Sequence, residues 1–287
     1  MRNISVRRLE ENDIAFVYDM VTLEDWNDRI EDIRRMLEYE REGCFIAEAN
    51  GEPAGHVFTV NYGKLGWISL LIVKSEHRKE GIGTLLMRRA IDYLITRGVE
   101  TIRLEAVPEI VNLYRKLEFV DEYYSLRFVG KTVKNVSSEI HCVSSMKLED
   151  ITSVAWFDQK YFGANRKRVI GKLFQESPQY CFVSRSENGI ISGYAMCRKA
   201  KIGYKLGPWT CAPRASEMAR WLFRRCLETI GEGEMVYVGV PEVNEGAVEI
   251  LKDHGFRQYS KSIRMYYGKK LAECVSGVFA IGGPMKG

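Results

Sequence analysis

Two kinds of hydrophobic pattern follow one another along the first half of the chain. Short runs rich in β-branched and aromatic residues predict strands, and longer stretches with an apolar side chain every three or four positions predict helices. Strands are expected at residues 4–9, 45–49, 53–60, 67–73 and 102–106, with the last strands within 119–130. Helices are expected at 13–23, 29–40 and 110–117, with a longer one starting at residue 81. This order predicts a mixed sheet flanked by helices.

Local signals mark the ends of several of these elements. The dipeptide Asn50-Gly51 predicts a tight turn between two antiparallel strands. Arg97-Gly98 predicts the end of the long helix, because glycine readily takes the left-handed conformation that closes a helix. One face of this helix is expected to be apolar, with Ile82, Leu85, Leu86, Ala90 and Leu94, and Arg88, Arg89 and Arg97 lie away from it.

The chain repeats itself at an offset of 137 residues (150 − 13, 181 − 44 and 256 − 119). Three landmarks recur at this offset in the same order: an Asp-Ile pair that opens a helix, a Cys-Phe pair that begins a strand, and a phenylalanine that follows a short helix. The pairs are Asp13 and Asp150, Cys44 and Cys181, and Phe119 and Phe256. Three agreements at one offset predict an internal duplication.

The duplication predicts two domains of the same α/β (α+β) class, each a mixed, mostly antiparallel sheet flanked by helices. We expect the first domain at residues 1–134 and the second at 138–287, joined by the polar segment 131–137. Residues 271–287 form a tail without a counterpart in the first half. A length of 287 residues is ordinary for two domains.

Composition excludes several classes of function. Hydrophobic residues make up 46% of the chain and charged residues 28%, as in soluble globular proteins. The net charge of +4 is spread along the chain, whereas nucleic-acid-binding proteins concentrate basic residues in a stripe or tail. The longest mostly apolar run, 65–73, is far shorter than the roughly 20 residues that cross a membrane, and the N-terminus shows no signal-peptide pattern. We expect a cytoplasmic monomer or homodimer without nucleic-acid or membrane partners.

The seven cysteines and four histidines are scattered, without a C-x-x-C pair or any other metal-ligand spacing. His141 and Cys142 are neighbours, but adjacent strand residues point to opposite faces and make poor joint ligands. We therefore expect free thiols, which suit a reducing compartment, and no metal site.

The segment that leads into the long helix carries the clearest chemistry. It contains Arg78, Gly81 and Gly83. Glycines let a ligand approach the backbone closely, and the start of a helix presents unbonded amides and the positive end of the helix dipole. An arginine adds charge-assisted hydrogen bonds to a phosphate. Together these features predict an anion-binding loop.

Other interpretations of the loop differ in how well they fit. The glycines alone also fit an ordinary turn before an amphipathic helix. A nucleoside-triphosphate loop would need a G-K-[S/T] sequence, which does not occur here. A dinucleotide fingerprint would need a third glycine at the position of Leu86. The choice between an ordinary turn and an anion loop therefore depends on the residues around it.

In its wider context the loop resembles that of the GNAT acyltransferase family. Arg78-x-x-Gly81-x-Gly83 follows a strand, and Leu113-Tyr114-x-x-x-x-Phe119 follows further along the chain. The expected order of elements over essentially the whole first half is also that of the GNAT fold. The second half resembles the tandem-GNAT group, whose second domain has lost its cofactor loop; this resemblance is carried by Phe162-Gly163-Ala164 and the ending Gly282-Gly283-Pro284-Met285-Lys286-Gly287.

The resemblance implies that acetyl-CoA is bound as the acyl donor. Its pantetheine arm would pair, like an added strand, with the backbone of residues 71–73, and the Val73 amide would face the acyl carbonyl. Tyr114 would protonate the leaving thiolate as a general acid; alternatively, its ring packs on the sheet. The implied cofactor-binding residues are Leu71, Ile72 and Val73 in the strand, and Arg78, Lys79, Glu80, Gly81, Ile82, Gly83 and Thr84 in the loop and helix start.

The attacking amine must lose a proton, so a base or a water held by one is required. Glu105 would lie beside the thioester on the strand at 102–106, although an exposed strand carboxylate is an equal interpretation. Asp25 and Glu109 are weaker candidates.

Two features depart from the family pattern. Many members have Gly-Lys where Lys79-Glu80 stands here, so Glu80 brings a negative charge near the phosphates. The usual asparagine before the tyrosine falls on Val107. The details around Tyr114 are therefore less well defined than the cofactor loop.

The second half keeps the pattern of the fold but not that of the loop. Leu251 stands where the tyrosine would be, and residues 211–217 contain no glycine pair. Pro213 in that segment has no N–H to donate. We expect the second domain to be a structural partner and a wall of the substrate site; the alternative is a changed pocket for another acyl-CoA or metabolite.

The leading hypothesis is an N-acetyltransferase that acts on a primary amine of a small molecule or peptide. The main alternative is an acetyl-CoA-binding sensor without turnover, and a third is a scaffold that uses neither site. Tyr114 favours the enzyme, because a sensor needs no acid for a leaving group. No spacing around Asp25, Trp26 and Arg29, the expected lining of the acceptor pocket, defines the acceptor.

Overall fold

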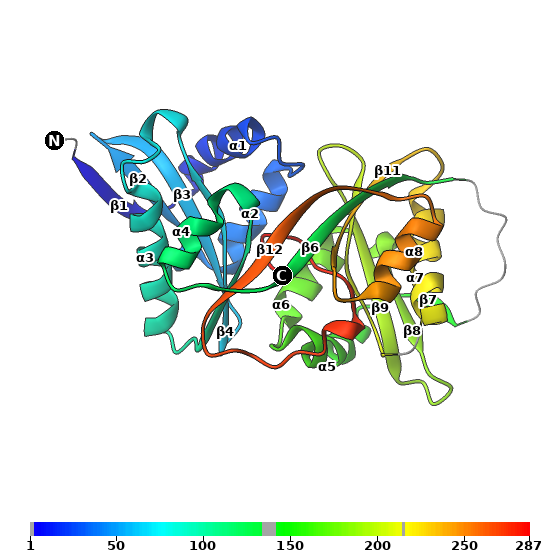
Figure 1. The fold of residues 1–287 in the computed structure, drawn as a ribbon. Helices are drawn as coiled ribbons and strands as arrows, with labels where there is room; N and C mark the ends of the chain where they lie inside the picture. Colours follow the sequence, from blue (N-terminus) through cyan, green and yellow to red (C-terminus); the bar gives the residue numbers. More distant parts are fainter. Residues whose placement is uncertain (1–2, 134–141, 214–215) are drawn as a thin grey trace. The chain divides into compact units, whose positions relative to one another are not determined.

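The computed structural model describes residues 3–133, 142–213 and 216–287 (Figure 1). Contacts within the chain divide it into two compact units. Unit 1 consists of residues 1–121, 265–270 and 284–286, and unit 2 consists of 122–264, 271–283 and 287. The expected domains, 1–134 and 138–287, follow the sequence repeat instead, and their boundary lies within 134–141, outside the described residues.

Unit 1 contains a mixed sheet. Strands β1 (Ile4–Arg8), β2 (Phe45–Ala49), β3 (Glu52–Asn61) and β4 (Leu65–Val73) are antiparallel neighbours, and β5 (Thr101–Ala106) runs parallel to β4. The end of β12 (Arg257–Gly268) lies next to β5. The helices are α1 (Ile14–Leu23), α2 (Ile30–Tyr39), α3 (Ile82–Thr96) and the short α4 (Val111–Lys116).

The helices of unit 1 cover both faces of its sheet (Figure 1). Phe45 pairs with Val57 across the strands and contacts Tyr93 of α3, so this face lies under α3. His56, the neighbour of Val57, points to the other face and contacts Phe16 of α1. Since α2 packs on α1, these two helices share that second face.

Unit 2 has a corresponding sheet. Its strands are β6 (Val120–Lys131), β7 (Val143–Ser145), β8 (Cys181–Arg185), β9 (Ile191–Lys199), β10 (Tyr204–Cys211), β11 (Met235–Pro241), the first part of β12 and the short β13 (Val278–Ala280). Their order is β12-β6-β11-β10-β9-β8-β7, with β13 beside β10. The helices are α5 (Asp150–Phe162), α6 (Lys167–Glu176), α7 (Ser216–Ile230) and α8 (Glu245–Asp253).

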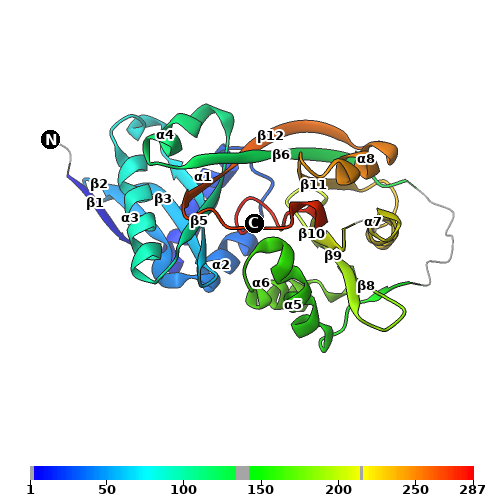
Figure 2. The same cartoon turned by 60° about the horizontal axis from the view of Figure 1, so that its bottom comes forward.

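Helices α5 and α7 lie on opposite faces of the unit 2 sheet (Figure 2). Gly193 of β9 lies against Leu222 of α7, whereas the neighbouring Tyr194 donates a hydrogen bond to Asp158 of α5. The core on the α7 side contains Trp209, which stacks on Phe223. The α/β class and the flanked, largely antiparallel sheets predicted from the sequence are confirmed.

Two details differ from the sequence-based expectation. Residues 119–130 were expected to form more than one strand, but β6 is a single strand that pairs with β11. No glycine or proline interrupts it before Gly130, so nothing in the segment induces a turn. On α3, Leu85 is 41% exposed although the pattern placed it on the apolar face, while Met87 and Tyr93 are buried.

Candidate active site

Strand β4 contains a β-bulge directly before the expected cofactor segment. Its register with β3 shifts between the pairs Phe58–Ser69 and His56–Ile72, so that Leu70 and Leu71 together stand opposite one residue of β3. Leu70 has a φ of +50°, in the left-handed region that leucine seldom adopts. A bulge bends a strand and redirects the side chains after it. Residues 71–73 therefore begin at a bend.

Strands β4 and β5 separate at the same place. Their parallel register joins Leu65 to Thr101 and continues only to the pair Trp67–Arg103. Within the described residues, the two strands share no further register pairs, although β4 continues to Val73 and β5 to Ala106. Backbone groups along the separated ends can therefore pair with an extended ligand, as an added strand does. We call this separation of β4 and β5 after Trp67 and Arg103 the splay of unit 1.

The loop after β4 presents the start of α3. Lys79 and Gly81 both have left-handed backbones, with φ of +69° and +87°, and Gly81 is the N-cap residue of α3. As a glycine, Gly81 has no side chain with which to cap this helix start. The first amides of α3 therefore remain available to an anion, and the helix dipole favours negative charge there.

Gly83 shows that three predicted segments come together. A Cβ atom at this position would lie 3.7 Å from Leu113 Cδ2 of α4 and 3.8 Å from Val73 Cγ2 of β4. The end of β4, the start of α3 and the helix that carries Tyr114 are thus in van der Waals reach of one residue. Three segments that are distant in sequence therefore lie close together.

Arg78 and Glu80, which lie in the exposed loop, both have partners within the protein. The Arg78 Nε donates to the Val73 carbonyl oxygen at 3.0 Å, and its guanidinium also pairs with Glu24. Glu80 lies 3.3 Å from His77 Nδ1. The negative charge of Glu80 is thereby directed at the His77 ring, and the Arg78 contacts fix the loop to the end of β4.

Tyr114 lies on α4 and is 5% exposed. Its ring meets that of Phe119 edge-on, with a centroid distance of 6.0 Å. Burial raises the pKa of its hydroxyl above the ordinary value for tyrosine. The hydroxyl is therefore protonated at neutral pH and can donate its proton or a hydrogen bond, as a general acid must.

The three candidate carboxylates occupy different settings. Glu105 is half-buried on the separated end of β5 and takes part in interactions of its own. Glu109 is exposed in the turn before α4, and Asp25 is exposed after α1 with a φ of +53°. Of the three, only Glu105 lies on a strand that borders the splay.

His56 is a residue of this region that the sequence interpretation did not include. It pairs with Ile72 across the bulge, is completely buried, and its ring lies edge-on to Phe16 and Phe58. Burial lowers the pKa of the imidazole to about 4, against a smaller opposing effect of the Leu70 backbone. The ring is therefore neutral at pH 7. A single histidine within a mostly apolar strand was the available signal.

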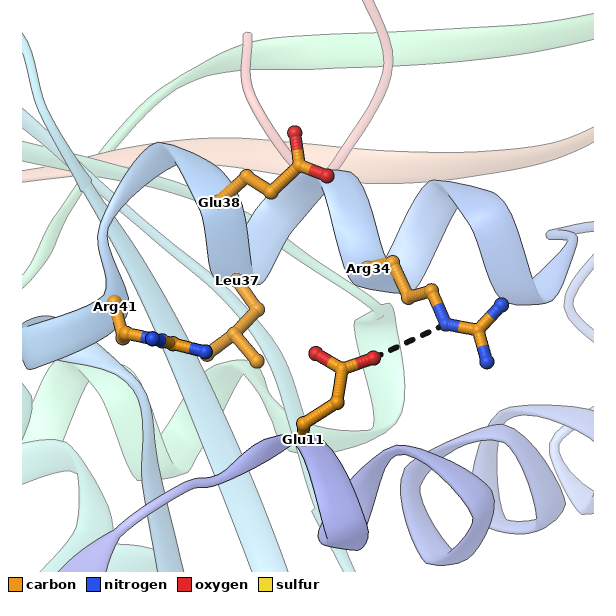
Figure 3. Close-up of a pocket in the computed structure, with 5 residues that line it drawn as sticks. All are labelled: Glu11, Arg34, Leu37, Glu38 and Arg41. Atoms are coloured by element: carbon orange, nitrogen blue, oxygen red, sulfur yellow. Dashed lines mark hydrogen bonds and ion pairs between the residues drawn. The ribbon is translucent and has the colours of Figure 1, made fainter.

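A separate pocket is lined by residues of α2, of the turn after it and of the turn before α1 (Figure 3). It is lined by Glu11, Arg34, Leu37, Glu38 and Arg41, and Arg34 pairs with Glu11 at 3.2 Å. None of these residues belongs to β4, β5, α3 or α4. The pocket is therefore not part of the splayed site.

The equivalent positions of the second half lack this chemistry. Leu251, at the position of Tyr114, is completely buried in the apolar core of unit 2. At the repeat offset of 137, residues 78–81 correspond to 215–218, and the first of these lies outside the described residues.

Neither a membrane-spanning helix nor a metal-ligand group occurs among the described residues. Across 3–133, 142–213 and 216–287, no helix is both long and apolar enough to span a bilayer. In the same ranges no three histidine, cysteine, aspartate or glutamate side chains are grouped as metal ligands would be.

Both halves of the chain match acetyltransferase families. Residues 9–119 match the Acetyltransferase (GNAT) family, and residues 154–280 match an Acetyltransferase (GNAT) domain. The holothin acyltransferase of Pseudoalteromonas sp. (strain SANK 73390) is 29% identical over 255 residues, covering 88% of this chain and 84% of that protein. The uncharacterized N-acetyltransferase YitH of Bacillus subtilis (strain 168) is 24% identical, covering 92% of this chain and 91% of YitH.

Solved structures show the same two-domain fold. A crystal structure of an acetyltransferase from Pyrococcus horikoshii has a TM-score of 0.84 and 26% identity, and covers 99% of this chain and 96% of that one. A tandem GNAT protein from the clavulanic acid biosynthesis pathway has a TM-score of 0.66 at 12% identity, covering 94% of this chain and all of that one. With both halves matched in sequence and fold, this chain belongs to the GNAT superfamily of N-acetyltransferases, as a member with two GNAT domains in tandem.

Proposed function

We propose that the protein transfers an acetyl group from acetyl-CoA to a primary amine of a small molecule or peptide, at the splay of β4 and β5 in unit 1. The observation that carries this proposal is the separation of these strands beside a helix start whose N-cap residue is a glycine. One feature accepts an extended arm and the other accepts an anion. Coenzyme A combines a pantetheine arm with phosphates and so requires both.

Each part of the donor has a suitable group in this chain. The amides of residues 79–84 would bind the pyrophosphate, helped by the left-handed Lys79 and Gly81. The backbone of residues 71–73, after the bulge, would pair with the pantetheine arm. The Val73 amide would donate to the thioester oxygen, on which negative charge develops during attack.

In the reaction, the amine nitrogen attacks the thioester carbonyl carbon, a C–N bond forms and the C–S bond breaks. The coenzyme A sulfur leaves as a thiolate, and Tyr114 donates its proton toward it. The proton lost from the amine passes to a base or to water held by one. Glu105 is the candidate in this chain, since it lies on the separated end of β5.

The choice of acceptor is limited by the chemistry of the reaction and by the name of one relative. An amine attacks only in its neutral form, so the acceptor must lose its proton within the site. One relative is named holothin acyltransferase, which supports a small-molecule acceptor over a protein for this chain too.

The direct test is release of free coenzyme A thiol from acetyl-CoA in the presence of a panel of small primary amines. We expect at least one amine to release thiol well above the rate of hydrolysis, together with an acetylated product by mass spectrometry. Tight acetyl-CoA binding without acetylation of any amine in a broad panel would contradict the enzyme and support the sensor alternative.

A further inference from the structure

Unit 2 contains the same strand separation as unit 1. Strands β10 and β11 run parallel and pair only from Tyr204–Val236 to Leu206–Val238. The register of β10 with β9 then shifts between Leu206 and Trp209, which is a second bulge. Gly207, with a φ of +142°, stands in this bulge 137 residues (207 − 70) after Leu70. The duplication has therefore kept both the bulge and the splay.

A segment of the chain itself lies in the second splay. Strand β13 pairs antiparallel with β10 through Trp209–Ala280 and Thr210–Val278. On the other side, the Ile281 amide donates to the Gly239 carbonyl oxygen of β11 at 2.9 Å. The tail thus forms backbone hydrogen bonds with both β10 and β11. We call the space between these two separated strands the slot of unit 2. An added strand in unit 1 would occupy the corresponding position.

The side chains of this segment complete the core. Phe279 is 4% exposed and its ring lies 5.0 Å from that of Trp209, centroid to centroid. Ala280 and Ile281 are buried as well. Because three successive residues lose contact with water, the segment occupies the slot as part of the fold rather than as a loop over its surface.

Two glycines leave room for the backbone of the tail. A Cβ atom at Gly207 would lie 2.1 Å from the Ile281 carbonyl oxygen. A Cβ atom at Gly277 would lie 2.3 Å from the ring of Tyr161. Non-bonded atoms do not come this close to each other, so only glycine at these two positions allows the tail to lie between β10 and β11.

Polar groups hold both ends of the segment. The Asn244 side chain donates to the carbonyl oxygens of Ser276 (3.2 Å) and Val278 (2.9 Å), and its oxygen caps α8 by accepting from the Ala247 amide. Beyond Ile281, the Gly287 carbonyl oxygen accepts from the Gly282 amide and from Arg166.

We propose that residues 276–281 are an internal ligand of the second domain: they occupy the slot that corresponds to the acyl-donor slot of the first domain. The second slot is therefore a binding site for an extended polypeptide segment, with the segment supplied by the same chain. An acyl-CoA could enter it only by displacing β13, so each chain carries one acyl-donor site.

Amide hydrogen exchange on the full chain tests whether the segment is resident. We expect the Ile281 amide to exchange at least about 100-fold more slowly than the amide of Ala272, which lies exposed in the connection before the segment. The Ile281 amide should exchange at the rate of the slowest β10 amides. Exchange of Ile281 at the rate of Ala272 would overturn the proposal.

A matched pair of glycine variants tests the fit. Gly207→Ala introduces the 2.1 Å contact, whereas Gly189→Ala changes a left-handed glycine at which an added Cβ atom would meet no atom within 4 Å. We expect Gly207→Ala to accelerate Ile281 exchange by ~10-fold or more relative to Gly189→Ala. Equal exchange in both would overturn the proposed fit; if Gly207→Ala does not fold, exchange in the natural chain still decides. If the chain binds two acetyl-CoA molecules while Ile281 stays protected, the exclusion of acyl-CoA from the second slot is overturned. If the natural chain binds no acetyl-CoA at all, only the proposed function is contradicted.

Discussion

The two separated strand pairs of this protein differ in the residues and segments that lie beside them. In unit 1, β4 and β5 separate beside a glycine-containing helix start and a buried tyrosine. In unit 2, β10 and β11 separate in the same way, but β13 pairs with β10 and Leu251 replaces the tyrosine. A duplicated fold can therefore keep the bulge and the strand separation in both copies, while the glycine at the helix start and the tyrosine occur in one copy only.

The comparison explains which features belong to the fold and which to the reaction. Leu70 and Gly207 occupy equivalent bulges, so the bulge itself does not indicate an acyl-donor site. Gly81 and Tyr114 have no equivalent in the second half. Substitutions at these two residues should therefore have the largest effects on acetyl-CoA binding and turnover.

The largest effect is expected at Gly81. Its φ of +87° is strained for any residue with a Cβ and most of all for a β-branched one, although a Cβ there would meet no atom within 4 Å. Because the added Cβ meets no nearby atom, Gly81→Val should leave the fold intact. Because the backbone conformation is strained, it should move the amides that bind phosphate. We expect acetyl-CoA affinity to fall on the order of 10³-fold, which calorimetry would measure.

The control for this change lies in the second domain. Ser216→Val alters the start of α7, the counterpart of α3, and should leave acetyl-CoA affinity unchanged. Equal losses in the two variants, or none in Gly81→Val, would show that the phosphate site is placed wrongly.

A smaller effect is expected at Tyr114. Tyr114→Phe removes the hydroxyl and hardly changes the packing of a ring that is 5% exposed. Turnover should fall on the order of 10²-fold, with acetyl-CoA affinity close to that of the natural protein, because the bond to sulfur strengthens only as charge develops there. Rapid kinetics with a good amine would measure both quantities.

Tyr161→Phe is the matched control for Tyr114→Phe, since Tyr161 is similarly buried in unit 2. It should leave turnover unchanged. If Tyr114→Phe acetylates the amine at the natural rate, Tyr114 is not the acid; if binding and turnover fall equally, its ring has a packing role instead.

The smallest of these effects concerns pH and again separates the two units. At the bulge, β4 pairs Ile72 with His56, whereas β10 pairs Trp209 with Ala195. The folded pKa of His56, about 4, lies below the ordinary value of 6.5, so below pH 6.5 the unfolded chain binds a proton that the folded chain does not. Stability that is present above pH 6.5 is therefore lost as the pH falls toward 4.

The expected loss from this histidine is about 2 kcal/mol between pH 6.5 and 5. Urea unfolding at both pH values would measure it, with unit 1 followed separately from unit 2. His56→Phe should reduce the pH dependence of unit 1 by that amount and leave unit 2 as it was. An unchanged slope in His56→Phe would contradict the assignment.

Much of the fold could be predicted from the sequence, and so could the segments that form the candidate site. The repeat, the helix start at Gly81 and the position of Leu251 are local or periodic signals, and the structure places each of the expected helices where its pattern lies. The segments of the site, residues 71–73, Gly83 and the helix of Tyr114, also come together.

Other features could not be predicted, because they depend on contacts between distant residues. Nothing local marks Leu70 for a left-handed backbone, since that conformation is enforced by the pairing of β3 with β4. The three residues of β13 are too few to show a period, and their strand exists only because β10 and β11 accept it. Similarly, β6 reads as the end of the first domain but pairs with β11.

The number of acetyl-CoA molecules bound per chain tests the central claim most directly. Calorimetry on the natural protein should give a stoichiometry of one, falling to no detectable binding in Gly81→Val at the same concentrations. A stoichiometry of two, or one site that survives Gly81→Val with unchanged affinity, would contradict the account that only the first domain holds an acyl donor.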